Sequence, residues 1–589
     1  MPGIFGIISK RPKEINCEEL NVMIKSLRME HFYNSGEFVL ADMAVYVGWT
    51  CHKGSFSDCL PIINEKKNKI LIYFGENFHD LDELDELKKR NHTFERKNAT
   101  YIIHMYEEWG EEFLLKLNGW FHGILIDIAK KKIILFNDRY GMQRMYYTET
   151  RDAFYFSAEA KAILRVQPQS RQVELMSLAE LFTHNCVLDH RSLFKELYML
   201  PGGACWTFDE NKKVKKRTYF EPVILENQPL LEKEFHYERL KNTFHNILKR
   251  YFRSEDQIGM FLSGSLDCRI MLANAQYGPG KLSCYALSNV YGIPDNISVT
   301  RRLAEIIGQS LRTLTIDDKY FSQYHELLER TIYVSDGGCD PSGTIELYLN
   351  QMAREIAPVR MLHSFGGTFL RGEEILHLTN LDNSLFNYEF QNAIRTALER
   401  YKELSSSSLT HKLHNGLAWS AYGKLSIQQS QLTIRAPFTD NDFVKLLYRS
   451  SNEVTSNDKL SRRLIEDGNP LFGKKGEIDR AMKRSHPLLK WGRINRIRET
   501  VKHHLLLEQE RVFLSGKKDS HNFRVWYRDE LSEYLKDILL DERSTNRFYI
   551  DKTSLEHIVT SHTKGIKNYT HEINKILMAE IVHRLFIDN

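Results

Sequence analysis

The feature that most constrains this chain is an apolar stretch that ends abruptly in a small, hydroxyl- and glycine-rich loop. The stretch runs from Gly259 to Leu262, the loop occupies 263–265, and apolar residues resume at Ile270 with a helix-like pattern. This order predicts a strand, a tight turn and a helix N-terminus. Backbone N–H groups at such a turn, with the helix dipole behind them, favour a phosphate-sized anion. An ordinary strand-to-helix turn without a ligand is the simpler interpretation of the loop taken alone.

The side chains around this turn suit a pyrophosphate and its metal ion. Ser263, Ser265 and Cys268 are small enough to let a pyrophosphate approach. Asp267 can hold the accompanying magnesium ion, because Mg²⁺ prefers carboxylate oxygens. The loop resembles the S-G-G-x-D-S pyrophosphate loop of the N-type ATP pyrophosphatases, from which it departs at Ser265 and Cys268.

Other motifs occur in a fixed order along the chain. They lie at residues 1–8, 75–78, 117–121, 137–141, 156–163, 335–342 and 435–440. In this order and at this spacing they resemble the glutamine-dependent asparagine synthetases, and the likeness extends from residue 1 to near residue 500. The resemblance implies an amidotransferase-like domain of the N-terminal-nucleophile (Ntn) type, followed by an ATP pyrophosphatase domain.

The chain is accordingly predicted to be a multidomain α/β protein. Residues 1–208 carry short strand-like segments and are expected to form an Ntn-type αββα sandwich with an inactive glutaminase site. A polar connector spans 209–231. Residues 232–589 are expected to form a parallel-sheet ATP pyrophosphatase domain with a helical C-terminal part. Within it, apolar spacing predicts helices over 232–252, 299–307 and 570–586, and strands over 282–287 and 310–316.

The first domain departs from the family where glutamine would be bound and cleaved. In the family a cysteine after the initiator Met attacks the glutamine amide, whereas this chain has Pro2, which offers no nucleophile. Phe74 replaces the Asn that precedes the family's Gly-Glu pair, although Glu76 is kept. Trp49 stands where an Arg would hold the glutamine carboxylate, and Asn98 where an Asp would hold its amino group. We therefore predict that this domain does not hydrolyse glutamine.

A second glycine-rich loop, residues 361–372, resembles the family's S-G-x-G-[SG]-D-E-x-x-G loop. Its glycines are retained, so we expect the backbone turn to be intact. Thr368 and Phe369 replace the acidic pair, of which the Asp is a magnesium ligand in the family. This leaves Asp267 as the principal metal ligand, with Asp336 or Asp340 as candidates to lie near it.

The two loops together define the predicted nucleotide site, in which the adenine edge lies against the backbone near Leu262 and Leu287. The predicted ATP- and pyrophosphate-binding residues are Leu262, Ser263, Gly264, Ser265, Leu266, Asp267, Cys268, Leu287, His363, Ser364, Gly366 and Gly367. The predicted catalytic residues are Asp267 and Lys483. In related synthetases a lysine in this region stabilises the transition state at the amide-forming carbon, and Lys483 matches it best. Basic residues outnumber acidic ones between Lys459 and Lys502, and a solvated helical face is the alternative for any one of them.

Composition excludes several classes of protein. The net charge of +4 over 589 residues is nearly balanced, so nucleic acid is not expected as a partner. The cysteines lie far apart with no C-x-x-C pair, which argues against a zinc ribbon, a redox dithiol or a disulfide framework. The sequence shows neither a membrane-spanning apolar stretch nor a secretory signal, so a cytoplasmic protein is expected.

The sequence thus predicts an ATP-dependent, AMP-forming carbon–nitrogen ligase with ATP and Mg²⁺ as cofactors. It would adenylate a carboxylate on a peptide or small molecule and join it to an amine without glutamine hydrolysis. Family members that have lost the cysteine include β-lactam synthetases and lasso peptide macrolactam cyclases. This precedent implies an intramolecular cyclase, with a precursor peptide or a protease as partner protein. Two alternatives stay open: a catalytically degenerate pseudoenzyme serving as a binding or assembly module, and a nucleotide-activating RNA-modifying enzyme.

Overall fold

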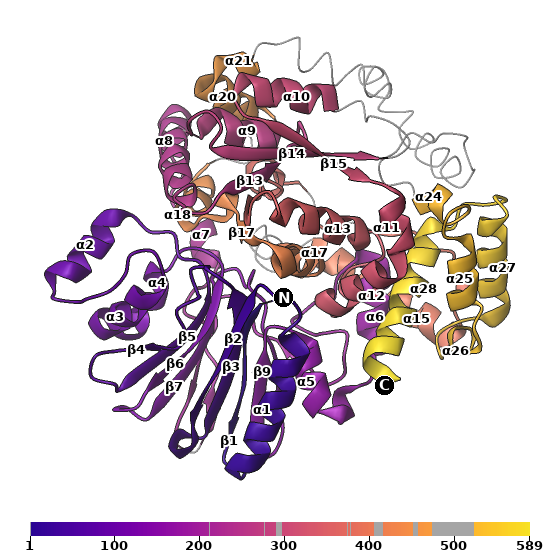
Figure 1. Cartoon of the computed structure of the whole chain (residues 1–589), viewed down its shortest axis with the longest axis horizontal. Helices are drawn as coiled ribbons and strands as arrows, with labels where there is room; N and C mark the ends of the chain where they lie inside the picture. The colour runs from indigo at the N-terminus through magenta and orange to yellow at the C-terminus, as the bar shows by residue number, and fades with distance from the viewer. Residues whose placement is uncertain are drawn as a thin grey trace.

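The computed structural model is a mixed α/β chain with two antiparallel sheets and one parallel sheet (Figure 1). It describes residues 2–210, 212–275, 277–289, 297–373, 375–376, 378–405, 416–450, 458–473 and 523–588. The predicted mixed α/β class and the predicted parallel sheet are confirmed.

The antiparallel sheets each contain six strands and together form the double-sheet part, the described residues of 2–215. The first sheet has the order β10-β8-β9-β1-β3-β2, with bounds Tyr198–Met199, Tyr146–Glu149, Ala153–Ser157, Gly3–Ser9, Val45–His52 and Tyr33–Leu40. The second has the order β12-β11-β7-β6-β5-β4, with bounds Val214–Lys215, Cys205–Phe208, Lys132–Asn137, Phe121–Asp127, Lys69–Gly75 and Ile62–Ile63. Because β12 lies within the predicted connector, the sheet continues past residue 208.

An apolar core lies between these two sheets. Along β1, Ile4 and Ile8 point into that core, whereas Phe5 and Ile7 point to the other face and pack against helices. The outer face of the first sheet is covered by α1 (Lys13–Leu27) and α5 (Ala160–Val166). The outer face of the second is covered by α2 (Leu81–Lys89), α3 (Thr100–Trp109) and α4 (Phe113–Lys116). The layers are therefore helix, sheet, sheet, helix.

The parallel sheet organises the rest of the chain, which we call the parallel-sheet part (described residues of 233–588). Its order is β15-β14-β13-β16-β17, with bounds Leu311–Ile316, Leu282–Asn289, Ile258–Phe261, Val359–Met361 and Thr433–Arg435. Most of its helices precede or follow these strands: α8 Lys233–Tyr251, α9 Leu266–Asn274, α10 Ile297–Ile306, α11 Asp318–Ser322, α12 Tyr324–Ser335, α13 Gly343–Arg354, α14 Gly366–Arg371, α17 Leu417–Gln431, α18 Asn441–Leu447 and α20 Lys459–Gly468. Others form a helical cluster near the C-terminus: α15 Tyr388–Ser405, α24 Phe523–Trp526, α25 Ser532–Leu539, α26 Glu542–Thr545, α27 Lys552–Thr563 and α28 Thr570–Val582. Helix α6 (Leu175–His184) lies within the sequence of the double-sheet part, and the short helix α7 (Val223–Glu226) lies between the two parts in sequence.

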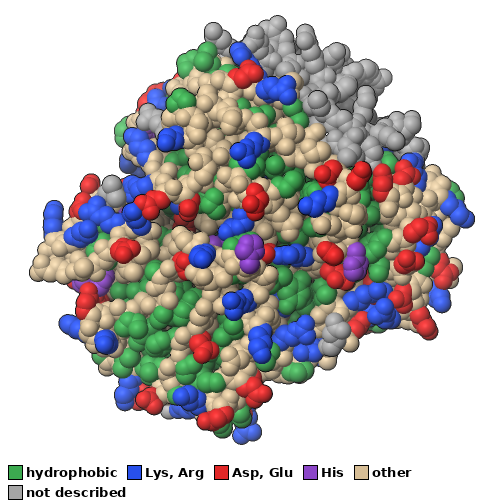
Figure 2. Space-filling model, viewed as in Figure 1, with side chains coloured by type: hydrophobic (Ala, Val, Ile, Leu, Met, Phe, Trp, Pro, Cys, Tyr) green, Lys and Arg blue, Asp and Glu red, His purple; other side chains and the backbone are tan. Residues whose placement is uncertain are grey.

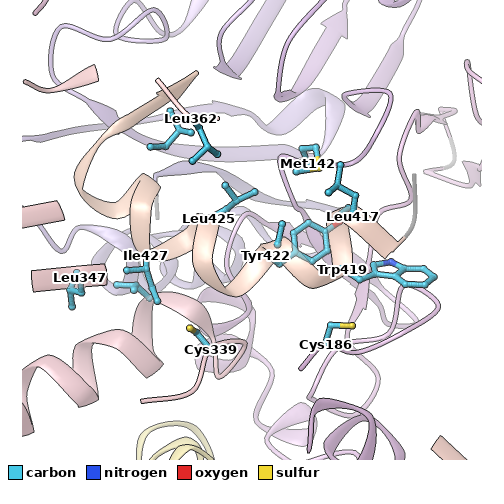
Figure 3. Close-up of a cluster of buried hydrophobic side chains, with 14 of the residues drawn as sticks. Met142, Cys186, Cys339, Leu347, Leu362, Leu417, Trp419, Tyr422, Leu425 and Ile427 are labelled. Atoms are coloured by element: carbon cyan, nitrogen blue, oxygen red, sulfur yellow. The ribbon is translucent and has the colours of Figure 1, made fainter. Parts of the chain in front are cut away.

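Helix α17 lies where the two parts meet (Figure 3). Met142, from the double-sheet part, lies close to Leu417 and Tyr422 of this helix. The Tyr422 hydroxyl donates to the carbonyl of Gly141 at 2.8 Å. On the other side of α17, Ile427 packs within the parallel-sheet part, so one helix contributes to the cores of both parts.

The described surface and core agree with the compositional expectations. All eight cysteines are unpaired, in agreement with the absence of a disulfide framework. Among the residues that the structure describes, no helix has the length and apolar character needed to cross a membrane. Figure 2 shows acidic and basic side chains interspersed over one face of the molecule.

Candidate nucleotide site and the former glutaminase pocket

The loop between β13 and α9 has the predicted strand–turn–helix geometry. Strand β13 ends at Phe261, and α9 begins at Leu266 with Ser265 as its N-cap, whose hydroxyl accepts from the Cys268 N–H at 3.3 Å. Gly264 has a φ of +74°, and a Cβ there would lie 3.1 Å from Val299 Cγ1. A glycine therefore fits this position both in backbone conformation and in space.

The loop also leaves backbone donors open. Among the described residues, the N–H groups of Leu266 and Asp267 have no protein acceptor, whereas those of Ser263 and Gly264 donate toward the Cys268 sulfur. The Ser263 and Ser265 hydroxyls lie 3.0 Å apart beside them. Open N–H groups at the start of a helix, next to two hydroxyls, form a cradle for a phosphate oxygen. The residues present therefore fit a nucleotide pyrophosphate.

The position of this loop in the sheet favours the same ligand. Strand β13 pairs with β14 on one side and with β16 on the other, and the chain order reverses between β13 and β16. Crevices at the carboxyl ends of strands at such a switch point are the usual ligand sites of open parallel sheets. The second predicted loop, residues 361–372, starts at the last residue of β16 and so lies at the same edge, and α14 forms its second half.

The second loop fixes Asp267 from the other side of the crevice. The Gly367 N–H donates to Asp267 Oδ2 at 2.9 Å. A Cβ on Gly366 would lie 2.9 Å from Asp267 Cγ, so the carboxylate needs glycine there. The structure thus brings together Asp267, Gly366 and Gly367, as predicted from the sequence.

Asp267 is also paired with a cation that the sequence analysis did not assign. Arg371, the last residue of α14, donates from Nη1 to Oδ1 at 2.7 Å and from Nη2 to Oδ2 at 3.2 Å. Burial raises the pKa of Asp267, and the hydrogen bonds and charge of Arg371 oppose that rise. Both oxygens predicted to bind magnesium already accept hydrogen bonds.

Arg371 lies among three carboxylates rather than one. Its Nε donates to Glu373 Oε1 at 2.7 Å and lies 3.8 Å from Asp458 Oδ1, and its Nη1 donates to the Ser461 hydroxyl at 3.2 Å. This guanidinium takes the central position that a divalent cation would need. The residues present therefore do not fit Mg²⁺ at Asp267 while Arg371 stays there, and magnesium binding remains a prediction.

The remaining predicted nucleotide residues lie around this loop in different ways. The Leu262 N–H donates to the Tyr285 carbonyl at 2.8 Å, and the predicted contact of this backbone with an adenine edge remains a prediction. Leu287 is on β14 and is buried, and Ser364 is exposed. His363 Nε2 donates to the Phe261 carbonyl at 3.2 Å, and burial lowers the pKa of this imidazole to about 4. Its Nδ1 is buried without a partner.

The other candidates from the sequence lie elsewhere. Lys483 and most of the basic segment lie outside the described residues.

Asp336, expected near Asp267, instead accepts from Arg144 Nη2 at 2.8 Å and from Lys161 Nζ at 3.0 Å where the two parts of the chain meet. Burial opposes its ionisation, but these cations outweigh burial and lower the pKa of Asp336. Asp340 Oδ1 accepts from the Ser342 N–H at 2.9 Å, in the turn that precedes α13. The expectation for Asp336 was wrong because both of its oxygens are committed to the interface.

Apolar side chains lie at the positions where the resemblance implies a glutamine pocket. Pro2 is buried, and Trp49 and Phe74 belong to the core between the two sheets. Phe74 lies 5.4 Å, centroid to centroid, from the ring of His122, whose Nε2 accepts from the Ile4 N–H at 3.2 Å. Apolar packing thus takes up the space that substrate-binding groups would need.

The other two positions compared with the family have structural roles. Asn98 Oδ1 accepts from the Thr100 N–H at 3.1 Å, at the first residue of α3. Glu76 Oε1 accepts from Arg435 Nη2 at 2.6 Å, which joins the two parts of the chain. The retained Glu76 therefore holds the interface together in this structure.

A small cavity lies between the implied glutamine pocket and the end of β17. Its volume is about 50 Å³, and its lining includes Phe74, Glu76, Trp120, Tyr251, Ile434 and Thr439. This space suffices for a few water molecules and is far below the roughly 300 Å³ at the lower end of small-molecule sites. The cavity is therefore too small for a glutamine.

Known proteins match parts of this chain. Residues 1–220 match the family model of the glutamine amidotransferase domain. The chain is also 21% identical over 360 residues to asparagine synthetase 1 of Bacillus subtilis, covering 59% of this chain and 55% of that protein. It is 27% identical over 295 residues to putative asparagine synthetase 2 of Methanocaldococcus jannaschii, covering 45% and 55%. The particular similarity is therefore to asparagine synthetases, and the chain spans about half the length of these relatives.

Among solved structures, the glutamine phosphoribosylpyrophosphate amidotransferase of B. subtilis, complexed with ADP and GMP, overlaps loosely. The identity is 11% and the TM-score 0.27, with 53% of this chain and 81% of that chain covered. So loose an overlap adds nothing to the assignment. The sequence similarities support the asparagine synthetase family, a family of ATP-dependent ligases.

Proposed function

We propose that this protein is an ATP-dependent carbon–nitrogen ligase that works without hydrolysing glutamine. The observation that carries the proposal is the pair of open N–H groups at Leu266 and Asp267, beside the Ser263 and Ser265 hydroxyls, at the switch point of the parallel sheet. A pyrophosphate group bound there would direct the α-phosphate toward the crevice between β13 and β16. The low identity to asparagine synthetases is consistent with a related reaction on another substrate.

In the proposed reaction a carboxylate oxygen of the substrate attacks the α-phosphorus of ATP. The bond from that phosphorus to the bridging oxygen breaks, pyrophosphate leaves, and an acyl-adenylate forms. An amine nitrogen then attacks the acyl carbon, AMP leaves, and the amine gives up a proton. The loop N–H groups and the positive end of α9 stabilise the departing pyrophosphate. Lys483 is proposed to stabilise the charge that develops at the acyl carbon.

The source of the amine follows from the former glutaminase pocket. Pro2 offers no nucleophile, and Trp49 and Phe74 fill the core beside it, so ammonia would not come from glutamine. The amine is then either free ammonia or a group on the substrate itself. We favour an intramolecular amide in a peptide or a small molecule, a lactam or macrolactam, with a precursor peptide or a protease as partner protein.

A second function is favoured by the contact between Arg371 and Asp267. In a catalytically degenerate relative, a guanidinium would neutralise the carboxylate that is predicted to bind the metal, as Arg371 does at Asp267. In that case the protein keeps the fold as a binding or assembly module. The two proposals differ in whether ATP binds productively at the loop.

Calorimetric titration of the full chain with ATP, with and without Mg²⁺, tests the ligase proposal. Saturable binding that Ser265→Pro abolishes supports it, because proline removes the loop's hydroxyl cap and an N–H. Ser322→Ala, at an exposed hydroxyl in a short helix far along the chain, is the matched control and should bind as wild type. Undetectable ATP binding in the folded wild type would overturn the ligase proposal and favour the module. In parallel, glutamate release from glutamine above a no-enzyme control would contradict glutamine independence.

A further inference from the structure

Two histidines and a glutamate converge on the outer side of the double-sheet part. His104 and Glu107 are one helical turn apart on α3, and His92 comes from the loop that follows α2. The described side chains of these three residues bring ligand atoms within 4.8 Å of one another. Figure 1 shows α3 at the edge of the molecule, well away from α9 and the nucleotide loop. The cluster is therefore separate from the candidate active site.

Two distances in this cluster are close to those of a tetrahedral metal site. Glu107 Oε2 lies 2.9 Å from His104 Nδ1 and 3.7 Å from His92 Nδ1. Zinc bound to nitrogen and oxygen at about 2.0–2.1 Å in a tetrahedron separates its ligand atoms by roughly 3.3 Å. The two measured separations bracket that value. The three ligand atoms lie within 4.8 Å of one another, so side-chain adjustment would bring all three to bonding distance from one ion.

A second layer of polar groups lies behind the ligands, hydrogen-bonded to His92 and Glu107 and at a longer distance from His104. Behind His92, Nε2 donates to Glu108 Oε1 at 2.8 Å, which leaves the Nδ1 lone pair facing Glu107. Behind His104, Nε2 lies 3.8 Å from Glu65 Oε1. The other oxygen of Glu107 accepts from Asn64 Nδ2 at 2.8 Å. A carboxylate behind each ligating histidine is the arrangement usual in protein metal sites.

The burial of the cluster also suits a bound ion. The side chains of His104, His92 and Glu107 are 5%, 15% and 16% exposed. The ligands are thus held in place by packing but remain within reach of one water molecule. The donor set of two imidazoles and a carboxylate is among those that zinc takes.

We propose that His92, His104 and Glu107 form a zinc-binding site, with a water molecule as the fourth ligand. The ion fastens the loop that carries His92 to α3, and so fixes the segment between α2 and α3 against the second sheet. Its role is structural, and it is independent of the proposed ligase function.

Untagged, full-length protein is first freed of metal with a chelator and dialysed. It is then titrated with Zn²⁺ alone, and with Co²⁺ as a spectroscopic probe. We expect one ion per chain, tetrahedral cobalt absorption bands, and a higher melting temperature with zinc. His92→Gln and Glu107→Gln should each weaken zinc binding at least about tenfold, and Glu108→Gln about 10- to 100-fold.

The matched control is His325→Gln, which alters an exposed histidine 3.2 Å from Glu329 and should leave zinc binding unchanged. His92 lies in a loop, so its variant is expected to fold, and circular dichroism of the metal-free forms checks this. Less than one-tenth of an ion bound per folded chain would overturn the proposal. So would zinc affinity unchanged in His92→Gln, or cobalt bands of octahedral type.

Discussion

Arg371 and Asp267 form a two-point hydrogen-bonded ion pair, with Nη1 2.7 Å from Oδ1 and Nη2 3.2 Å from Oδ2. The pair joins the end of α14 to the start of α9, across the crevice between β13 and β16. The Arg371 guanidinium therefore occupies the position at which the resemblance implies a metal ion. Any nucleotide at the loop therefore meets a guanidinium beside Asp267, and any magnesium ion must compete with it.

Replacing Arg371 by Gln should destabilise the protein by about 2–3 kcal/mol at neutral pH, because it leaves Asp267 buried without its cation. The sign of the pH dependence follows from Asp267, whose pKa is raised by burial. Above its pKa the unpaired charge is costly, and as the pH falls through that pKa the group is protonated. The difference from wild type should therefore shrink in acid.

Urea unfolding of Arg371→Gln and wild type at pH 7 and pH 4 measures this difference. Arg302→Gln is the control, since it alters an exposed pair with Glu305 and should cost little at either pH. A loss of stability in Arg371→Gln that grows toward acid would contradict the assignment of Asp267 as its charged partner.

Replacing Asp336 by Asn should cost about 3–5 kcal/mol, because Arg144 and Lys161 would lose the carboxylate that neutralises them in a fully buried site. Since this cluster joins the two parts of the chain, proteolysis between them should also become faster. The free energy of unfolding and the rate of limited proteolysis are the measurements. Asp318→Asn, at an exposed acid, should change neither. Wild-type stability in Asp336→Asn would show that the interface does not depend on this charge.

The buried His122 should make the protein lose stability in mild acid. Burial lowers its pKa from 6.5 to about 3, so only the unfolded chain takes up a proton between those values. Stability is therefore present above pH 6.5 and lost as the pH falls, by up to about 1.4 kcal/mol per pH unit for one histidine. His122→Gln should flatten the dependence of unfolding free energy on pH between 6.5 and 4, and His325→Gln should not. An unchanged slope in His122→Gln would contradict this account.

The sequence was sufficient for elements with a strong apolar period. The helix predicted over 232–252 is α8, Lys233–Tyr251, and the strand predicted over 310–316 is β15, Leu311–Ile316. The turn over 263–265 was also predicted correctly, because glycine adopts the backbone conformation of a tight turn and serine is a preferred helix N-cap. Local pattern alone determines features of this kind.

The partners of buried charges were not predictable in the same way. Arg371 reaches Asp267 from 104 positions along the chain, and only the close approach at Gly366 and Gly367 brings them together. Asp336 reads as a polar loop residue, yet the packing of α12 beside the double-sheet part commits it to Lys161. The i, i+3 spacing of His104 and Glu107 was visible in the sequence, but the arrival of His92 from a loop was not.

The relation between Arg371 and the residue at position 368 separates the two proposed functions. Thr368→Asp returns a carboxylate to α14, one residue beyond Gly367 and three residues before Arg371 on the same helix. With Arg371 present, the new charge should join the acids around that guanidinium, and ATP affinity should not change. In the double variant with Arg371→Gln, the two carboxylates at positions 267 and 368 are free to bind Mg²⁺.

In that double variant a working ligase site should bind ATP with Mg²⁺ about tenfold more tightly than wild type, a gain of about 1.4 kcal/mol, and without Mg²⁺ no more tightly. Calorimetric titration of wild type and both variants, with and without the metal, measures this. Glu329→Gln combined with Arg302→Gln, both exposed, provides a double variant that should bind as wild type. If a folded double variant binds no nucleotide even with Mg²⁺, removal of Arg371 does not restore a nucleotide site. That outcome would contradict the ligase proposal and favour the binding or assembly module.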